Sequence, residues 1–169
     1  YFTGFGANKR IVFFDTLIKS LSVDETEAVL AHELGHFRKN HIKKGIALMA
    51  AMTLAGLAIL GWLINQDNFY HGLGINEPST YIGLLLFMIV SPLFTFFVSP
   101  LFSAFSRKNE FEADDYEKQQ SNADNLVSAL VKMYEENAST LTPDHLHSVF
   151  YDSHPPAPIR IARLQGTTS

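Results

Sequence analysis

The stretch 28-AVLAHELGHFRKNH-41 decides the fold, because it places two histidines four residues apart and a glutamate directly after the first. On a helix, side chains at this spacing point to the same side, so the imidazoles of His32 and His36 face together. The arrangement suits two bonds of about 2.0–2.1 Å to zinc, with Glu33 beside the metal to take a proton from bound water. The alternative is a solvated helix that carries two histidines by chance. Acidic residues farther along the chain favour the metal site.

A helix is expected to begin shortly before this motif. Ser22 is a candidate cap, and Glu25, three residues later, completes a capping box. We find neither a proline nor a cap signal between Glu25 and Ile64. The sequence therefore predicts one long helix that starts at Val23, contains both histidines and continues into an apolar run.

Two apolar runs follow the motif. Residues 46–64 carry no charge, and residues 81–105 are interrupted only by Pro92 and Pro100. Both runs are at least as long as the roughly 18 apolar residues that span a bilayer. We predict transmembrane helices at 46–64 and 81–105, joined by a loop at 65–80. The alternative is a pair of buried helices in a soluble core, but such helices usually keep a polar stripe.

The charges near these runs predict a topology. The basic residues lie outside the hairpin: Lys39, Lys43, Lys44, Arg107 and Lys108. The intervening loop contains Asp67 and Glu77 but neither lysine nor arginine. Under the positive-inside rule both flanks face the cytoplasm and the loop faces the other side. The residues before the first run and after the second are therefore expected to meet.

A catalytic zinc needs a third protein ligand. The extended zincin motif requires histidine at position 42, which is Ile42 here, so that subclass is excluded. The segment "NEFEAD" offers Glu110, with Asp114 four residues later on the same face. Glu112 projects about 200° away from Glu110 and is a poor alternative. The competing interpretation is an ordinary solvated acidic helix.

Other polar residues are weaker candidates. Asp114 could accept a hydrogen bond from the outer nitrogen of a ligand histidine. His154 and Arg160, around a proline-rich turn, could stabilise an oxyanion. His41 lies five residues after His36, about 140° off the ligand face, so we expect it to be structural. Three histidines have no predicted role: His71, His145 and His147.

Residues 1–15 are expected to form two short strands around a turn. The edge of the second strand could align an extended peptide substrate through Ile11, Val12, Phe13 and Phe14. An ordinary structural strand is the equal alternative. Ser121 or Asn122 is expected to cap a later amphipathic helix in which Leu126, Leu130 and Met133 share a face.

The bulk properties exclude several classes of protein. The chain has 169 residues, a net charge of −4 and no cysteine. An acidic chain without basic stripes gives no reason to expect nucleic acid as a partner. Any zinc must be held by histidine and carboxylate. Because the chain begins without methionine or a signal peptide, we expect one peptidase domain over 1–169 that is a fragment of a longer membrane protein.

In order, the motifs "NKRIVFFDTLI", "LAHELGHFRKNH", "SRKNEFEAD" and "YDSHPPAPIRIARL" resemble those of the CAAX prenyl protease 1 family of integral-membrane, gluzincin-type endopeptidases. The resemblance implies one Zn²⁺ per chain, held by His32, His36 and Glu110. It implies that Glu33 is the catalytic base and Asp114 a carboxylate behind the ligands. His154 and Arg160 would contact the substrate or transition state. Phe37 departs from the tryptophan frequent in the family.

The expected fold is mainly α with a small N-terminal β-hairpin (α+β), as a zincin-like catalytic domain that carries a two-helix transmembrane hairpin. The expected function is hydrolysis of CAAX C-termini or membrane-associated peptides by a zinc-activated water. Its partners would be the bilayer and a peptide or protein substrate, which could carry a lipid. The protein would be multi-pass, with its site on the cytoplasmic side of the bacterial inner membrane or the endoplasmic reticulum. Alternatives are a heat-shock-type membrane protease, a non-catalytic zinc scaffold and a soluble helical enzyme.

Overall fold

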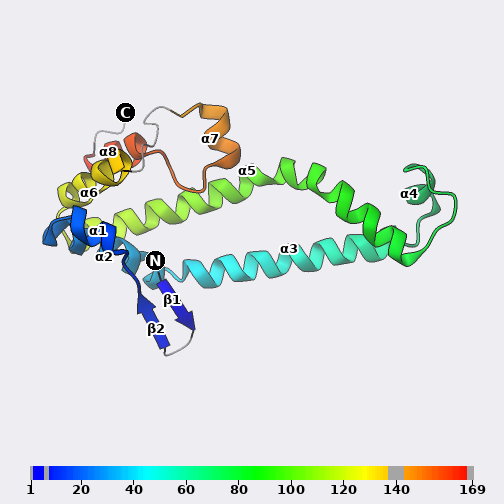
Figure 1. The fold of residues 1–169 in the computed structure, drawn as a ribbon, viewed down its shortest axis with the longest axis horizontal. Coiled ribbons are helices and arrows are strands. Elements are labelled where there is room, and N and C mark those ends of the chain that lie inside the picture. Colours follow the sequence, from blue (N-terminus) through cyan, green and yellow to red (C-terminus); the bar gives the residue numbers. More distant parts are fainter. Residues whose placement is uncertain (1, 6–7, 137–142, 167–169) are drawn as a thin grey trace. The chain divides into compact units, whose positions relative to one another are not determined.

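The computed structural model describes residues 2–5, 8–136 and 143–166, which are mostly helical (Figure 1). In chain order the elements are β1 (Phe2–Phe5), β2 (Asn8–Ile11), α1 (Asp15–Ser20), α2 (Val23–Arg38), α3 (His41–Leu63), α4 (Asp67–His71), α5 (Thr80–Gln120), α6 (Ala123–Glu136), α7 (His145–Tyr151) and α8 (Ala157–Leu164). The two strands pair antiparallel, with Phe2 opposite Ile11. The predicted turn between them falls partly on residues 6–7, outside the described residues.

The chain divides into two compact units. The terminal unit comprises Tyr1–His41 and Leu101–Ser169, and the hairpin unit comprises Ile42–Pro100. Helix α5 contributes its first half to the hairpin unit and its second half to the terminal unit. The HELGH motif and the acidic segment around Glu110 therefore belong to the same unit.

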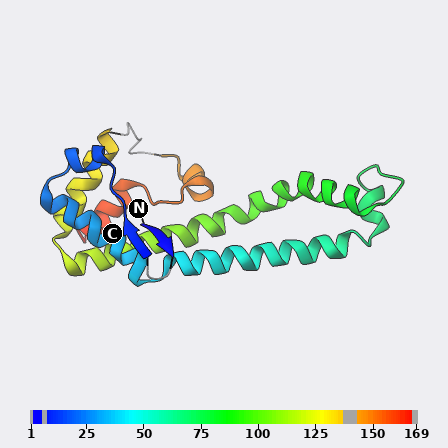
Figure 2. The ribbon, with the colours of Figure 1, turned by 60° about the horizontal axis from the view of Figure 1, so that its bottom comes forward.

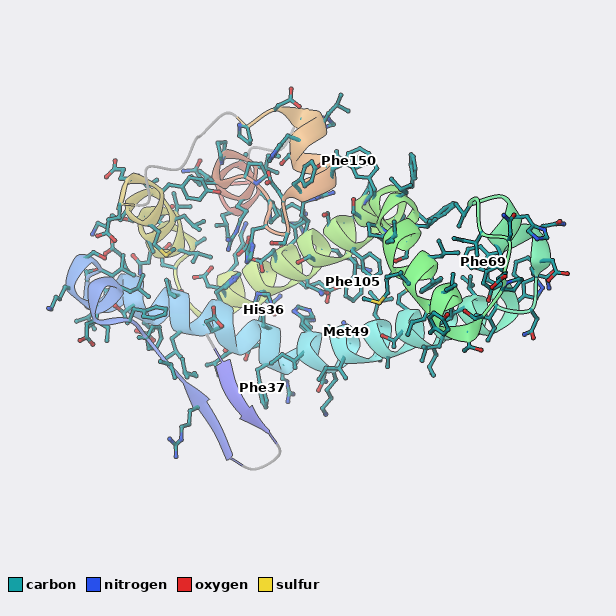
Figure 3. The ribbon with its side chains drawn as sticks, turned by 45° about the vertical axis from the view of Figure 1, so that its right-hand side comes forward. His36, Phe37, Met49, Phe69, Phe105 and Phe150 are labelled. Carbon is teal, nitrogen blue, oxygen red and sulfur yellow. The ribbon has the colours of Figure 1, made fainter. Side chains whose placement is uncertain are left out.

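In the hairpin unit, α3 and the first half of α5 run side by side (Figure 2). Both helices are long and apolar enough to cross a membrane, and their most hydrophobic 18-residue windows are only 0% and 6% buried. Large side chains such as Met49, which is 69% exposed, face outward (Figure 3). A helix in a soluble core buries such residues, so this exposure favours a lipid environment.

The predicted loop at 65–80 contains the short helix α4, which the sequence pattern did not indicate. The hydroxyl of Tyr70 donates a hydrogen bond to the carbonyl of Ile64 at 3.1 Å, and it lies 3.3 Å from the carbonyl of Ser79. Tyr70 is almost fully buried. The tyrosine thus ties together the two ends of the connection.

The start of α2 confirms the predicted capping box. The Glu25 amide donates to Oγ of Ser22 at 3.2 Å, and the Ser22 amide donates to Oε2 of Glu25 at 2.6 Å. The same carboxylate accepts hydrogen bonds from Ser128 at 2.5 Å and Lys132 at 2.7 Å on α6. Glu25 therefore caps one helix and ties it to another.

The prediction of a single helix from Val23 to Ile64 was wrong, because α2 ends at Arg38 and α3 begins at His41. Asn40 has a φ of +56°, in the left-handed region. Asparagine adopts this conformation more readily than most residues and often follows the end of a helix. The helix is therefore interrupted between the HELGH motif and the apolar run.

The second strand also ends earlier than predicted. It stops at Ile11, Asp15 already begins α1, and the residues between them belong to neither element. Phe13 packs instead against a cluster of buried apolar residues: Leu21, Ala28, Val29, Leu126, Ala129, Leu130 and Leu164. The chain therefore leaves the strand conformation after Ile11, where Phe13 turns towards this cluster.

Helix α6 faces this core as expected. Leu126 and Leu130 are buried and Met133 is partly buried against the same cluster. The side chain of Asn122 accepts a hydrogen bond from the Asp124 amide at 3.1 Å, which makes Asn122 the cap that the sequence indicated. Ser121 instead donates to Glu117.

A close backbone contact joins α2 to α5 at Gly35. A Cβ atom on Gly35 would lie 3.0 Å from both the Cα and the carbonyl oxygen of Ala113. Ala113 is fully buried. Only glycine permits this backbone approach, which brings together the two helices that carry the predicted ligands.

We expect Gly35→Ala to destabilise the protein by about 1–3 kcal/mol, because the added methyl must move the α5 backbone. The matched control is Gly45→Ala, where a Cβ would meet nothing within 4 Å. There the gain in helix propensity should stabilise by about 0.5–1 kcal/mol. Denaturant unfolding in detergent measures both. Equal stability of the two variants would contradict the role of Gly35.

The capping carboxylate predicts a pH dependence. Hydrogen bonds from Lys132 and Ser128 lower the pKa of Glu25 from 4.5 to about 2. A lowered folded-state pKa means that its stabilisation is complete above pH 4.5 and is lost as the pH falls towards 2. Glu25→Gln keeps a capping side chain but loses this charge. Unfolding at pH 6 to 2.5 should show the stability gap between the two proteins closing, and the exposed Glu27→Gln should show no such gap.

Candidate metal centre

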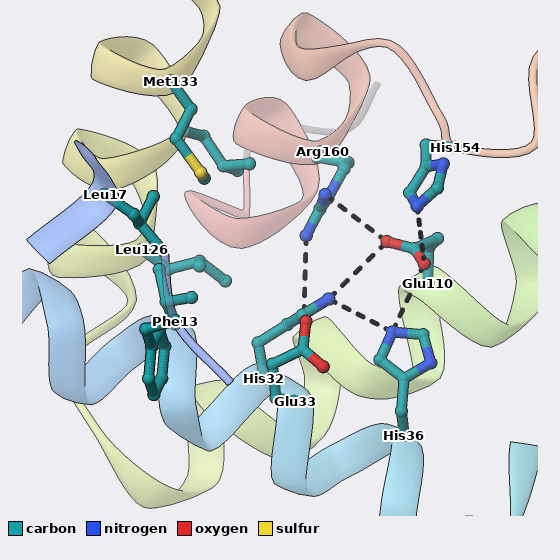
Figure 4. Close-up of a pocket in the computed structure, with 12 residues that line it drawn as sticks. Phe13, Leu17, His32, Glu33, His36, Glu110, Leu126, Met133, His154 and Arg160 are labelled. Carbon is teal, nitrogen blue, oxygen red and sulfur yellow. Dashed lines mark hydrogen bonds and ion pairs between the residues drawn. The ribbon is translucent and has the colours of Figure 1, made fainter. Parts of the chain in front are cut away.

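Three predicted ligands converge in the terminal unit. His32 and His36 come from α2 and Glu110 from α5, and they could hold a metal ion through atoms that all lie within 4.8 Å of one another. The two Nε2 atoms are 3.2 Å apart. The Glu110 oxygens lie 3.6 Å from Nε2 of His32 and 3.3 Å from Nε2 of His36 (Figure 4). The structure thus unites residues that are far apart in sequence.

These distances fit a zinc ion. In a tetrahedral site with bonds of about 2.0–2.1 Å, neighbouring ligand atoms are about 3.3–3.4 Å apart. The two Nε2 atoms are 3.2 Å apart, and each lies 3.3–3.6 Å from a different oxygen of Glu110, so the three groups come close to that separation. Two histidines and one glutamate are also a ligand set of catalytic zinc sites, which leave a fourth position open.

The ligand carboxylate remains charged despite its burial. Glu110 is only 5% exposed, and burial alone would raise its pKa. Hydrogen bonds that Nε2 of His32 and of His36 donate in their protonated form outweigh that effect, so the pKa of Glu110 lies well below its usual range. An ionised carboxylate is the form that binds a metal.

Asp114 sits directly behind the first ligand. It is fully buried, and its Oδ1 lies 2.9 Å from Nδ1 of His32. Burial would raise the pKa of Asp114, but the hydrogen bonds with His32 and Arg160 lower it. Because an ionised carboxylate can only accept, Nδ1 of His32 carries the proton. Its Nε2 is then the atom that can bind a metal once it has lost its own proton.

Arg160 is occupied by carboxylates. The guanidinium donates to both oxygens of Asp114, at 2.9 and 2.6 Å, and its NH1 lies 3.5 Å from Glu110. Arg160 is buried, at 7% exposure. The sequence suggested an oxyanion donor, whereas these contacts make Arg160 first of all a partner that holds Asp114.

His154 lies at the open side of the site. Its Nε2 is 3.4 Å from Oε1 of Glu110, while its side chain remains 66% exposed. Arg107 on α5 supports the segment that leads to it, by donating to the carbonyls of Ser148 and Asp152 at 3.0 Å each. The sequence indicated Arg107 only as a topology signal and did not suggest this contact.

A cavity of about 220 Å³ opens onto these groups. Its polar wall consists of His32, Glu33, His36, Glu110, His154 and Arg160. Its apolar wall consists of Phe13, Leu17, Val29, Leu126, Leu130 and Met133. Of the four residues proposed as a substrate strand, only Phe13 lines this cavity; Ile11, Val12 and Phe14 do not. The α6 face was expected from its periodicity, but its position beside the ligands was not.

His41 and Glu112 also join the site, although the sequence assigned them no chemical role. His41 is buried, at 6% exposure. Its two ring nitrogens lie 3.0 Å from Nδ1 of His36 and 3.1 Å from Oε2 of Glu112. The rotation that separated His41 from the ligand face assumed an unbroken helix, and the break at Asn40 removes that assumption.

Comparisons with known proteins agree with this geometry. The chain is 38% identical to a CAAX prenyl protease 1 homologue of Arabidopsis thaliana, covering 98% of this chain and 39% of that protein. It is 35% identical to CAAX prenyl protease 1 of Saccharomyces cerevisiae, covering 97% of this chain and 40% of that protein. The crystal structure of S. mikatae Ste24p superposes with a TM-score of 0.84 at 34% identity, covering 97% of this chain and 42% of that one.

The chain thus spans about two fifths of the length of these relatives. Within that span the likeness includes the helices that carry the predicted ligands, since 97% of this chain is covered. The profile of Peptidase family M48 matches residues 1–168. The chain belongs to peptidase family M48.

Proposed function

We propose that this chain is the catalytic part of a membrane-embedded zinc endopeptidase that processes CAAX-type, prenylated C-termini. The observation that carries the proposal is the convergence of two imidazole nitrogens and one buried carboxylate at distances that suit one zinc ion. A glutamate directly beside the first ligand lines the same cavity. A purely structural zinc site has no use for that glutamate.

The metal would be held by His32, His36 and Glu110, one ion per chain. When bound, zinc supplies Lewis acidity, which lowers the pKa of a bound water towards about 7 and polarises a carbonyl group. The protein's part is to keep the carboxylate ionised and to hold Nε2 of both histidines at the metal position. Asp114 would fix the ring orientation of His32 through the hydrogen bond at Nδ1.

Glu33 is the proposed general base. Its carboxylate accepts a proton from the attacking water and later delivers it to the nitrogen of the leaving amine. His154, which is exposed at the mouth of the site, is placed to donate a hydrogen bond to the oxyanion. Arg160 acts mainly by holding Asp114 and by facing Glu110.

The location of the site suits a membrane-bound substrate. Only ten residues separate His36 from Ile46, where the first apolar run begins (46 − 36 = 10). Lys43 and Lys44 precede that run and Arg107 follows the second, which supports an active site on the cytoplasmic side. Relatives named CAAX prenyl protease 1 support prenylated peptides as the substrate class. In a eukaryote the corresponding membrane would be the endoplasmic reticulum.

The apolar wall of the cavity indicates what lies beside the scissile bond. Six apolar side chains face the ligand set across about 220 Å³, which suits one aliphatic side chain of a peptide. Ile11, at the end of β2, could still pair with an extended substrate backbone as the sequence suggested. Phe13 would then contact a substrate side chain within the cavity.

We expect Glu33→Gln to lower the proteolytic rate by about 10²–10⁴-fold, because the amide cannot accept the water proton. The bound zinc should remain, since Glu33 is not a ligand in this site. Cleavage of a prenylated peptide and metal content of the purified protein measure the two effects. Glu27→Gln, an exposed change on the same helix, is the control. Undiminished cleavage by the Glu33 variant would refute the mechanism.

We expect Met133→Ala to widen the cavity and to change side-chain preference. The ratio of kcat/KM for a peptide with a bulky aromatic residue over one with a small aliphatic residue should rise about 10-fold. A series of otherwise identical prenylated peptides measures this ratio. Val131→Ala is the matched control, because Val131 is on the same helix but does not line the cavity. An unchanged ratio in the Met133 variant would show that the cavity does not receive this side chain.

A further inference from the structure

The second metal ligand, His36, has its own chain of hydrogen bonds. Its Nδ1 lies 3.0 Å from Nδ1 of His41, and Nε2 of His41 lies 3.1 Å from Oε2 of Glu112. The rings of His36 and His41 meet edge to face, with centroids 5.0 Å apart. His41 is buried, with a side chain only 5% exposed. These three residues form a continuous path from α2 through the first residue of α3 to α5.

The Glu112 carboxylate, at the end of this path, determines which nitrogen atoms donate and which accept. A carboxylate at neutral pH offers only acceptors, so Nε2 of His41 carries a hydrogen and donates it to Glu112. Nδ1 of His41 then has a lone pair. Because it faces Nδ1 of His36, that atom must carry the hydrogen between them. In the neutral ring, Nε2 of His36 is then the acceptor, which is the form that binds a metal.

We propose that Glu112 and His41 form a relay that fixes the tautomer and ring orientation of His36, as Asp114 does for His32. His41 and Glu112 are positioning residues, since they act on the metal through His36. The proposal rests on the function proposed above, because it assumes that His36 binds zinc. Partners behind metal-bound histidines commonly change metal affinity or activity by about 10–100-fold.

The helix break makes this relay possible. If α2 had continued, His41 would point about 140° away from His36. The left-handed conformation of Asn40 ends α2, and His41 then begins α3 with its ring beside His36. Helix α5 thus provides the ligand Glu110 and the terminal acceptors for both histidines.

The test compares zinc binding by variants of the full chain in detergent. His41→Phe fills the same volume but can neither accept from His36 nor donate to Glu112. We expect it to lower zinc affinity about 10–100-fold, measured by competition with a chelator. With Co²⁺ as the probe, the visible absorption bands should shift, because the orientation of His36 changes. The exposed His71→Phe is the matched control and should alter neither readout.

Two further variants separate positioning from packing. His41→Asn should restore most of the affinity, since its amide oxygen can accept from His36 and its amide nitrogen can donate to Glu112. Glu112→Met should weaken binding, and its effect should not add to that of His41→Phe, because both break one path. These two variants decide the question if His41→Phe does not fold.

Each outcome bears on a different claim. Zinc affinity and Co²⁺ spectra unchanged in folded His41→Phe and Glu112→Met proteins would overturn the relay while leaving the proposed function intact. Equal losses in the Asn and Phe variants would show that hydrogen bonds made by residue 41 do not hold His36, which also overturns the relay. Absence of zinc binding by the unaltered chain would overturn the proposed function and the relay together.

Discussion

The backbone contact between Gly35 and Ala113 is the constraint on which the terminal unit depends. His32 and His36 flank Gly35 on α2, and Glu110 and Asp114 flank Ala113 on α5. Metal–ligand bond lengths vary by only about 0.2 Å, so a larger side chain at position 35 that moved the two helices apart would weaken the predicted ligand set. Helix packing normally keeps axes about 8–10 Å apart, and small residues at the contact give the closest approach. The predicted metal site therefore depends on the missing side chain at Gly35 as well as on the ligands themselves.

Charge balance explains why the buried carboxylates coexist. Glu110 and Asp114 bring two negative charges into a buried site, and Arg160 supplies one positive charge. An uncompensated buried charge is costly, and the imbalance that Arg160 leaves can be met by a proton on His32 or by a bound cation. Burial lowers the pKa of His32, but its hydrogen bonds with Asp114 and Glu110 raise it overall. The lowered pKa values of both acids mean that protonation does not remove that imbalance near neutral pH. A divalent ion would be held by electrostatics as well as by coordination.

The sequence predicted the features that depend on helix geometry over one turn. The facing histidines, the capping box at Ser22 and the buried face of α6 each follow from a spacing of three or four residues. The break at Asn40 did not follow, because one residue in the left-handed region ends a helix without altering the surrounding pattern. Because of this one backbone angle, His41 lies beside His36 and not on the opposite side of the helix as expected. The apolar wall of the cavity depends on how α6 packs beside α2, which periodicity within one helix cannot reveal.

One face of α5 organises the C-terminal segment. Its polar residues recur at intervals of three or four: Ser103, Arg107, Glu110, Asp114 and Lys118. The first two bind carbonyls at the end of α7, and the last donates to the carbonyl of Leu164 at the end of α8. His154 lies between these two attachments and Arg160 lies just before the second. A segment held at both ends on the helix that carries Glu110 must present its intermediate residues at the level of that ligand. The exposure of His154 beside a buried Arg160 thus follows from where these two attachments lie along α5.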